Sequence, residues 1–80
     1  MATKWDLRDW IVEALRRNGG SASVVEVCRD VWQVHEHDLR ASGDLFYTWQ
    51  YDIRWVAQEM RNSGQLGRAE KRNGPWRLPA

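Results

Sequence analysis

The spacing of apolar residues predicts three helices followed by two short strands. Over residues 48–62 the apolar positions return every three or four residues, which is the period of an amphipathic helix about four turns long. Thr48 is expected to cap this helix, because its hydroxyl can accept hydrogen bonds from the first-turn amides. Gly64, just past the last periodic residue, suits a left-handed stop. The face predicted to be buried carries Trp49, Ile53, Val56, Ala57 and Met60.

The opposite face of this helix departs from the usual mixture of Glu and Lys. It carries arginine, amide and aromatic side chains, and its acids, Asp52 and Glu59, lie toward the flanks. Arginine, amide and aromatic groups are what a helix needs to read base edges in a DNA groove. The alternative is an ordinary solvated helix with one aromatic residue covered by a neighbour. The residues on or beside this face are Tyr51, Arg54, Trp55, Gln58, Arg61 and Asn62.

Two helices are predicted before this one. The first begins at Thr3, its expected cap, and ends at Asn18-Gly19-Gly20; it is interpreted as scaffold. After a connector or very short strand at 20–23, the second begins at Ser23, where Glu26 completes a capping box. The predicted buried positions are Leu7, Ile11, Ala14 and Leu15 in the first helix, and Val24, Val27, Cys28, Val31 and His35 in the second.

The segments on either side of the third helix set the fold class. Residues 36–44 are polar and predict a loop, and 45–47 form either a hydrophobic staple or an aromatic lip at the helix entry. Residues 65–69 and 75–78 predict a hairpin around Asn73-Gly74, packed on the helices through Leu66, Trp76 and Leu78. Pro75 is expected at an edge or at the first position of its strand. The prediction is a single α+β domain over residues 1–80, a winged helix-turn-helix with three helices and a C-terminal two-stranded β wing.

Charge is unevenly distributed although the net charge is +1. Residues 1–44 hold six Lys/Arg against eight Asp/Glu, and residues 45–80 hold six against three. A positive C-terminal half favours a polyanionic partner. The predicted hairpin could straddle a phosphate backbone, or its basic residues could simply keep an edge ribbon soluble. Those residues are Arg68, Lys71, Arg72 and Arg77.

Composition bounds the remaining possibilities. Eighty residues build one thin core, to which six tryptophans can add large buried area. Neither an apolar run near 18 residues nor a signal-peptide pattern is present, so a soluble cytoplasmic protein is expected. Cys28, the single cysteine, is expected to be a small core residue.

No catalytic motif is visible in the sequence. The run His35-Glu36-His37-Asp38 invites a metal interpretation, but no second cluster supplies the remaining ligands. There is no phosphate-binding glycine loop, no plausible triad and no paired carboxylates. No enzyme, cofactor or metal site is predicted, and any nuclease activity would belong to another domain or chain.

Two segments of the chain resemble a known family. Ile53-Arg54-Trp55-Val56-Ala57 with Met60 and Gly64-Gln65-Leu66, followed by Asn73-Gly74-Pro75-Trp76-Arg77-Leu78, resembles the winged-helix domain at the N-terminus of Mrr-type restriction endonucleases. Gly19-Gly20 with residues 21–27 matches the junction between that domain's first two helices, so the likeness covers nearly the whole chain. The resemblance implies a DNA-binding module, often attached to a nuclease that attacks modified DNA. Some similar winged helices sense N6-methyladenine.

The residue chemistry is compatible with methyl sensing. N6-methylation places a methyl group in the major groove, where adenine otherwise offers a donor amine. An aromatic wall would favour that methyl group, and an amide could bond to N7 of the same base. The candidates for the wall are Trp49, Trp55, Tyr47, Tyr51 and Trp32.

The leading hypothesis from the sequence is a module that binds double-stranded DNA, as the targeting part of a restriction system. Thr48, Gln50, Tyr51, Arg54 and Gln58 would lie nearest the bases, and Arg61, Arg68, Lys71, Arg72 and Arg77 would contact phosphates. One alternative is a winged helix that contacts protein through exposed tryptophans. Another is a stand-alone transcriptional regulator.

Overall fold

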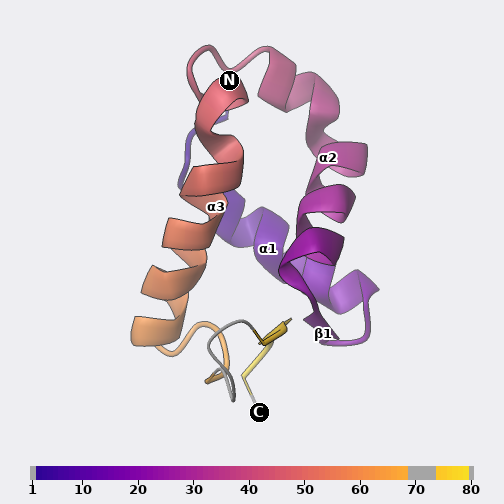
Figure 1. Ribbon diagram of the computed structural model, residues 1–80, viewed down its shortest axis with the longest axis vertical. Helices are drawn as coiled ribbons and strands as arrows, with labels where there is room; N and C mark the ends of the chain where they lie inside the picture. The colour runs from indigo at the N-terminus through magenta and orange to yellow at the C-terminus, as the bar shows by residue number, and fades with distance from the viewer. Residues whose placement is uncertain (1, 69–73, 80) are drawn as a thin grey trace.

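The computed structural model describes residues 2–68 and 74–79, which form three helices and a two-stranded antiparallel sheet (Figure 1). The elements in order are α1 (Asp6–Arg17), β1 (Ser21–Ala22), α2 (Val24–Arg40), α3 (Leu45–Asn62) and β2 (Trp76–Arg77). The predicted α+β class is confirmed. Within the described ranges, no helix has the length and apolarity needed to cross a membrane.

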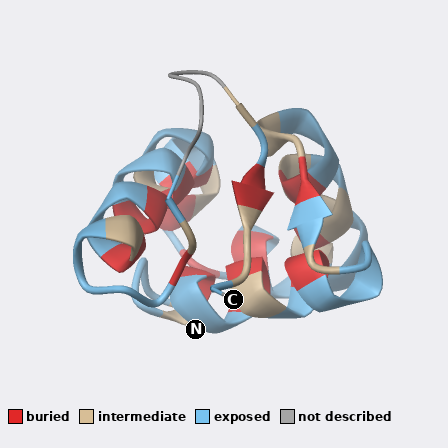
Figure 2. Cartoon of the chain, turned by 90° about the horizontal axis from the view of Figure 1, so that it is seen from below, coloured by how far each residue is buried: buried red, intermediate tan, exposed pale blue. Residues whose placement is uncertain are grey.

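The core lies where the three helices meet. Each helix packs against the other two, and Figure 2 marks buried residues on all three. The predicted stripe of α1 is confirmed, since all four of its residues are buried. The stripe of α3 is confirmed too, and Leu45 extends it by one turn. The fully buried side chains include Leu7, Ile11, Leu15, Val31, Ile53 and Val56.

The local signals that start and stop helices are largely confirmed. The Ser23 hydroxyl accepts from the Glu26 N–H at 3.1 Å, and the Glu26 carboxylate accepts from the Ser23 N–H at 2.8 Å. Gly64 follows α3 with a φ of 84°, and the next N–H donates to the Met60 carbonyl at 2.7 Å. The Thr3 cap is wrong: α1 begins at Asp6, whose carboxylate accepts from the Thr3 N–H at 2.8 Å, and Trp5 holds the N-cap position.

The loop predicted over residues 36–44 is mostly helix. The second helix continues to Arg40, because Leu39 adds a fully buried position and Arg40 bonds to Glu36 one turn back at 2.8 Å. The helix is kinked at His35, with φ −115° and ψ 15°. A short turn over 41–44 is what remains of the predicted loop.

The predicted start of the third helix is also wrong. Leu45, Phe46 and Tyr47 form its first turn, and Asp44 is the N-cap. The cause is Leu45, which lies one turn before Trp49 and is buried with it. Thr48 therefore lies inside α3, where its hydroxyl donates to the Asp52 carboxylate at 2.8 Å instead of accepting from first-turn amides.

The C-terminal strand does not have the partner that the sequence predicts. β2 pairs antiparallel with β1, with Ser21 opposite Arg77 and Ala22 opposite Trp76. Residues 65–68 are not a strand, although the Gly67 N–H donates to the Arg77 carbonyl at 2.8 Å. The turn predicted around Asn73 lies largely outside the described residues. The predicted closure is confirmed, because Leu66 and Trp76 are buried and Leu78 packs against the core.

The capping box of α2 yields a stability prediction. Ser23→Ala should lower the free energy of unfolding by about 1 kcal/mol, since the Glu26 N–H loses its acceptor, the Ser23 hydroxyl. Urea denaturation measures the loss, and Ser21→Ala is the matched control because Ser21 is exposed in β1 and caps no helix. Equal stability of the two variants would contradict the cap.

The same cap makes stability depend on acid pH. Hydrogen bonds from the Ser23 N–H and hydroxyl lower the pKa of Glu26 below its usual value near 4.5. A carboxylate with a lowered folded-state pKa stabilises the fold above its unfolded-state pKa, and that contribution is lost as the pH falls through the folded-state pKa. Ser23→Ala should therefore show a shallower loss of stability below about pH 4.5 than the unchanged protein.

Candidate nucleic-acid interface

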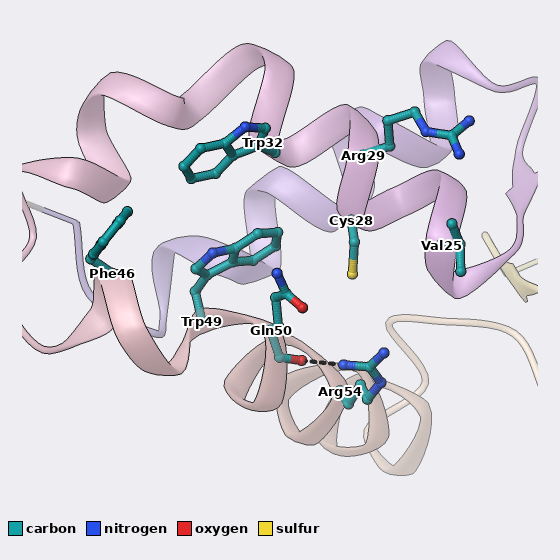
Figure 3. Close-up of a pocket in the computed structure, with 8 residues that line it drawn as sticks. All are labelled: Val25, Cys28, Arg29, Trp32, Phe46, Trp49, Gln50 and Arg54. Carbon is teal, nitrogen blue, oxygen red and sulfur yellow. Dashed lines mark hydrogen bonds between the residues drawn. The ribbon is translucent and has the colours of Figure 1, made fainter.

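A hollow lies between α2 and α3 and is lined by side chains of both helices (Figure 3). Its upper part is a cavity of about 490 Å³. In Figure 3 the Cys28 thiol points from α2 toward α3, and the Gln50 side chain reaches from α3 toward α2. Trp32, Phe46 and Trp49 lie at one end of this cavity, and Val25 with Arg29 lies at the other.

The hollow continues along α3 toward the sheet. Its middle part shares Val25 and Arg54 with the upper cavity, and its lower part shares Gln58 and Arg61 with the middle. Arg68 lines the lower end. We call these three adjoining pockets together the arginine groove, defined by Arg29, Arg54, Arg61 and Arg68.

The arginine groove is electrically one-sided. No Asp or Glu occurs among the described residues that line it. Arg29, Arg54 and Arg61 form no ion pair with a described carboxylate, whereas Arg17 on the far side of the molecule pairs with Asp30. Guanidinium groups without a carboxylate partner beside a concave surface attract an anion, and walls of low dielectric strengthen that field.

Hydrogen bonds within α3 hold several of the predicted base-reading side chains. Arg54 Nη1 donates to the Gln50 carbonyl at 2.6 Å, which holds the guanidinium beside the groove (Figure 3). Gln58 accepts from Arg61 at 3.4 Å and donates to Asn62 at 3.1 Å. These contacts are exposed and local to one helix, so a ligand could exchange them for its own at small cost.

The five candidates for an aromatic wall are divided among three places. Trp49 is buried and stacks on Trp32, with ring centroids 6.2 Å apart and planes at 7°, beside the arginine groove. Trp55 lies on the other flank of α3, edge-on to Trp5 at 5.9 Å. Tyr47 and Tyr51 lie on the solvent-exposed side of α3, and their exposed fractions are 83% and 74%. The structure therefore joins Trp32 with Trp49, and it separates both from Trp55.

The predicted polar residues come together only in part. Gln50, Arg54, Gln58 and Arg61 share the groove side of α3, with Arg68 at its end. Thr48 is engaged by Asp52, and the Arg77 backbone is tied to Gly67 and β1. Lys71 and Arg72 lie outside the described residues.

Sequence reasoning named Trp32 but missed the rest of the contribution of α2. Val25, Arg29 and Trp32 line the groove from that helix. They recur at four- and three-residue spacing on the face beside the predicted core stripe, so a helical wheel of the second helix contained the signal. Arg29 is the added cation, and its side chain extends along α2 at the Val25 end of the cavity (Figure 3).

Two residues singled out for other roles have structural explanations. The His35 ring stacks on Trp10 with centroids 3.9 Å apart, and its Nε2 lies 3.2 Å from the Glu13 carboxylate. In the described parts of the chain, no three His, Cys, Asp or Glu side chains are grouped to hold a metal. Cys28 is half-buried: it packs against the core and also lines the groove.

A scan against protein-family models found no match to this chain, and searches of the curated proteins and of the solved structures found none either.

The position of Cys28 yields a prediction about its reactivity. Burial raises the pKa of the Cys28 thiol, and the charge of Arg54 offsets part of that rise. Since the thiolate is the reacting form, alkylation by iodoacetamide should be slower than for a free thiol at neutral pH, with its pH profile displaced upward. Arg54→Ala should displace the profile further, and Arg16→Ala, which removes a charge in the last turn of α1, should not. A profile like that of free cysteine would contradict the half-buried placement.

Proposed function

We propose that this chain is a winged-helix module that binds double-stranded DNA, with α3 in the major groove. The order helix, strand, helix, helix, C-terminal strand is the order of a winged helix-turn-helix, and antiparallel closure of β1 on β2 agrees with that topology. The backbone bond between Gly67 and Arg77 is compatible with a wing made by the C-terminal segment. The resemblance to Mrr-type N-terminal domains supports the same fold.

The observation that carries the proposal is the arginine groove. Its four guanidinium groups come from both helices and from the segment after α3, and no described carboxylate lies among them. A phosphate backbone is the polyanion that matches a row of this kind, because each neutralised phosphate releases counterions and adds affinity. Arginine also bonds to phosphate oxygens and to guanine in a bidentate manner.

The side chains divide into two roles under this proposal. Gln50, Arg54 and Gln58 lie on the exposed side of α3 and present amide and guanidinium groups suited to base edges. Arg61 and Arg68 lie further along the groove and would contact phosphates, with Arg29 as an additional contact from α2. Lys71 and Arg72 remain candidates for further phosphate contacts.

We further propose that the module is the targeting part of a modification-dependent restriction system and reads N6-methyladenine in the major groove. The support is the family resemblance together with the placement of Trp32 and Trp49 beside Gln50 and Arg54. An apolar indole edge would favour the methyl group, and the Gln50 amide could bond to the same base. Any nuclease activity would reside on another domain or on an associated chain.

A second candidate function is contact with a protein. The observation that favours it is the exposure of Trp5 and Trp55, 49% and 41%, since partly exposed tryptophans are frequent anchors of interfaces. This alternative requires no affinity for duplex DNA. A stand-alone transcriptional regulator would instead bind one unmodified operator and would be indifferent to methylation.

Replacing single arginines of α3 should distinguish residues that read bases from residues that contact phosphates. Arg61→Ala should weaken binding to all duplexes and reduce the magnitude of the salt slope by about 1, because one phosphate contact is lost. Arg54→Ala should cost about 1–3 kcal/mol on the preferred site and relax discrimination among sites. Fluorescence anisotropy with labelled duplexes at several salt concentrations measures both quantities.

The matched control for these variants is Arg16→Ala. Arg16 is exposed in the last turn of α1, and its removal changes net charge by the same amount without altering the groove. We expect its affinity and salt slope to stay close to those of the unchanged protein. Absence of duplex binding at moderate salt would refute the DNA proposal and favour the protein-contact alternative.

Methyl recognition is tested with three matched duplexes that are unmodified, adenine-methylated or cytosine-methylated. We expect the adenine-methylated duplex to bind most tightly, and Trp32→Ala or Gln50→Ala to reduce that preference more than the overall affinity. Both substitutions keep net charge constant, so the salt slope should not change. Equal affinity for all three duplexes would remove the methyl-reading role while leaving DNA binding intact.

A further inference from the structure

A second cationic surface lies on the flank of α3 opposite the arginine groove. The Lys4 ammonium lies 4.6 Å from the centroid of the Trp55 ring and 5.3 Å from that of Trp5. The Arg8 guanidinium lies 5.5 Å from the Trp5 ring. The two indoles contact each other edge to face. We call these four residues the N-terminal cation cluster.

The N-terminal cation cluster is held in place by contacts on both sides. The Ala2 N–H donates to the hydroxyl of Ser42, a buried residue in the turn before α3, at 3.0 Å. Trp5 bridges to α3 through Trp55. Figure 1 shows the N-terminal segment passing beside α3 on the side away from α2. The segment that carries Lys4 is thus fixed relative to α3.

The cations of this cluster lie over aromatic rings and not beside carboxylates. Neither Lys4 nor Arg8 forms an ion pair with a described residue. A ring face attracts a cation without neutralising its charge, so both groups keep their field for an external anion. Two nearby acids accept hydrogen bonds from neutral donors and keep their charge: Asp6 accepts from the Thr3 N–H and Asp52 from the Thr48 hydroxyl. Glu59, one turn after Trp55 on α3, is exposed.

The exposed ridge of α3 separates the two cationic surfaces. On a helical wheel with 100° per residue, Tyr51 and Asn62 mark this ridge. Arg54 lies on one side of it and Trp55 on the other. A helix with its side chains is about 10–12 Å across, and the major groove of B-DNA is about 12 Å wide with a phosphate strand on each border. A helix inserted in that groove therefore meets phosphates on both of its flanks.

We propose that the N-terminal cation cluster binds the second phosphate strand, the one across the major groove from the strand held by the arginine groove. The proposal rests on the proposed insertion of α3 into duplex DNA. Lys4 and Arg8 contact the phosphate oxygens, and the Trp5–Trp55 pair positions them. Both flanks of α3 then contact phosphates, one flank on each strand of the duplex. Single-stranded DNA cannot make both sets of contacts.

The first test compares the salt dependence of duplex binding for the full chain and its variants. Replacing both Lys4 and Arg8 with alanine should reduce the magnitude of the salt slope by about 2, since about 0.9 counterion is released for each phosphate contact. Arg16→Ala, at the other end of α1, should leave the slope unchanged. Circular dichroism and thermal unfolding confirm that the double variant stays folded. An unchanged slope in a folded double variant would overturn the proposal.

The second test uses the carboxylate that borders the cluster. Glu59→Gln should tighten duplex binding several-fold at low salt, because a phosphate strand on this flank is repelled by Glu59. Glu36→Gln, which lies on α2 in an ion pair with Arg40, is the matched control and should have a smaller effect. Equal affinities of Glu59→Gln and the unchanged protein would count against a strand on this flank.

The third test assigns each flank to its strand. Duplexes with neutral methylphosphonate linkages on one strand at a time should each bind the unchanged protein more weakly. In the double variant at Lys4 and Arg8, methylphosphonates on the second strand should no longer matter, while those on the first strand still should. Loss of sensitivity on both strands together would refute the strand assignment. Failure of the unchanged protein to bind any duplex would instead refute the proposed function itself.

Discussion

The rotation of α3 about its own axis is the constraint on which every other feature depends. A buried stripe from Leu45 to Met60 packs into the angle between α1 and α2, and its central residue, Ile53, is fully buried. Turning the helix by one residue would expose that stripe and bury charged groups, at a cost far above the stability of so small a domain. Arg54 and Arg61 therefore face α2, and Trp55 faces the N-terminus, because the apolar side permits no other orientation.

The fold was predictable where a few neighbouring residues decide the structure. The capping box at Ser23, the glycine stop at Gly64 and the apolar periods of α1 and α3 all rest on contacts within one or two turns, and all are found. The errors arise where distant residues decide. Leu39 and Leu45 extend their helices because the assembled core buries them, and β2 pairs with β1, the short strand between the first two helices. A local hairpin signal carries no information about that competing partner.

The candidate site shows the same division between local and distant information. The arginines of α3 fall on one side by helical period alone, so their grouping was predictable from spacing. The packing partner of each indole was not predictable from spacing, because it depends on which neighbouring segment lies opposite. Trp49 meets Trp32 of α2, whereas Trp55 meets Trp5 and, through it, Lys4 and Arg8. Lys4 and Arg8 lie in the half of the sequence with negative net charge, so the charge totals pointed away from them.

The pairing of β1 with β2 also bears on how the molecule assembles. All three pairs of helices pack together, including α1 with α3, while the two-residue strands must bring together residues 21–22 and 76–77, which lie still further apart in the sequence. Closing so long a loop costs more chain entropy than closing any of the connections between helices, and the reward is a ladder of very few bonds. The three helices can thus assemble first, and the C-terminal segment that carries β2 can pair with β1 last. We expect the same segment to open most readily from the native state, so a ligand that binds it would stabilise the whole domain.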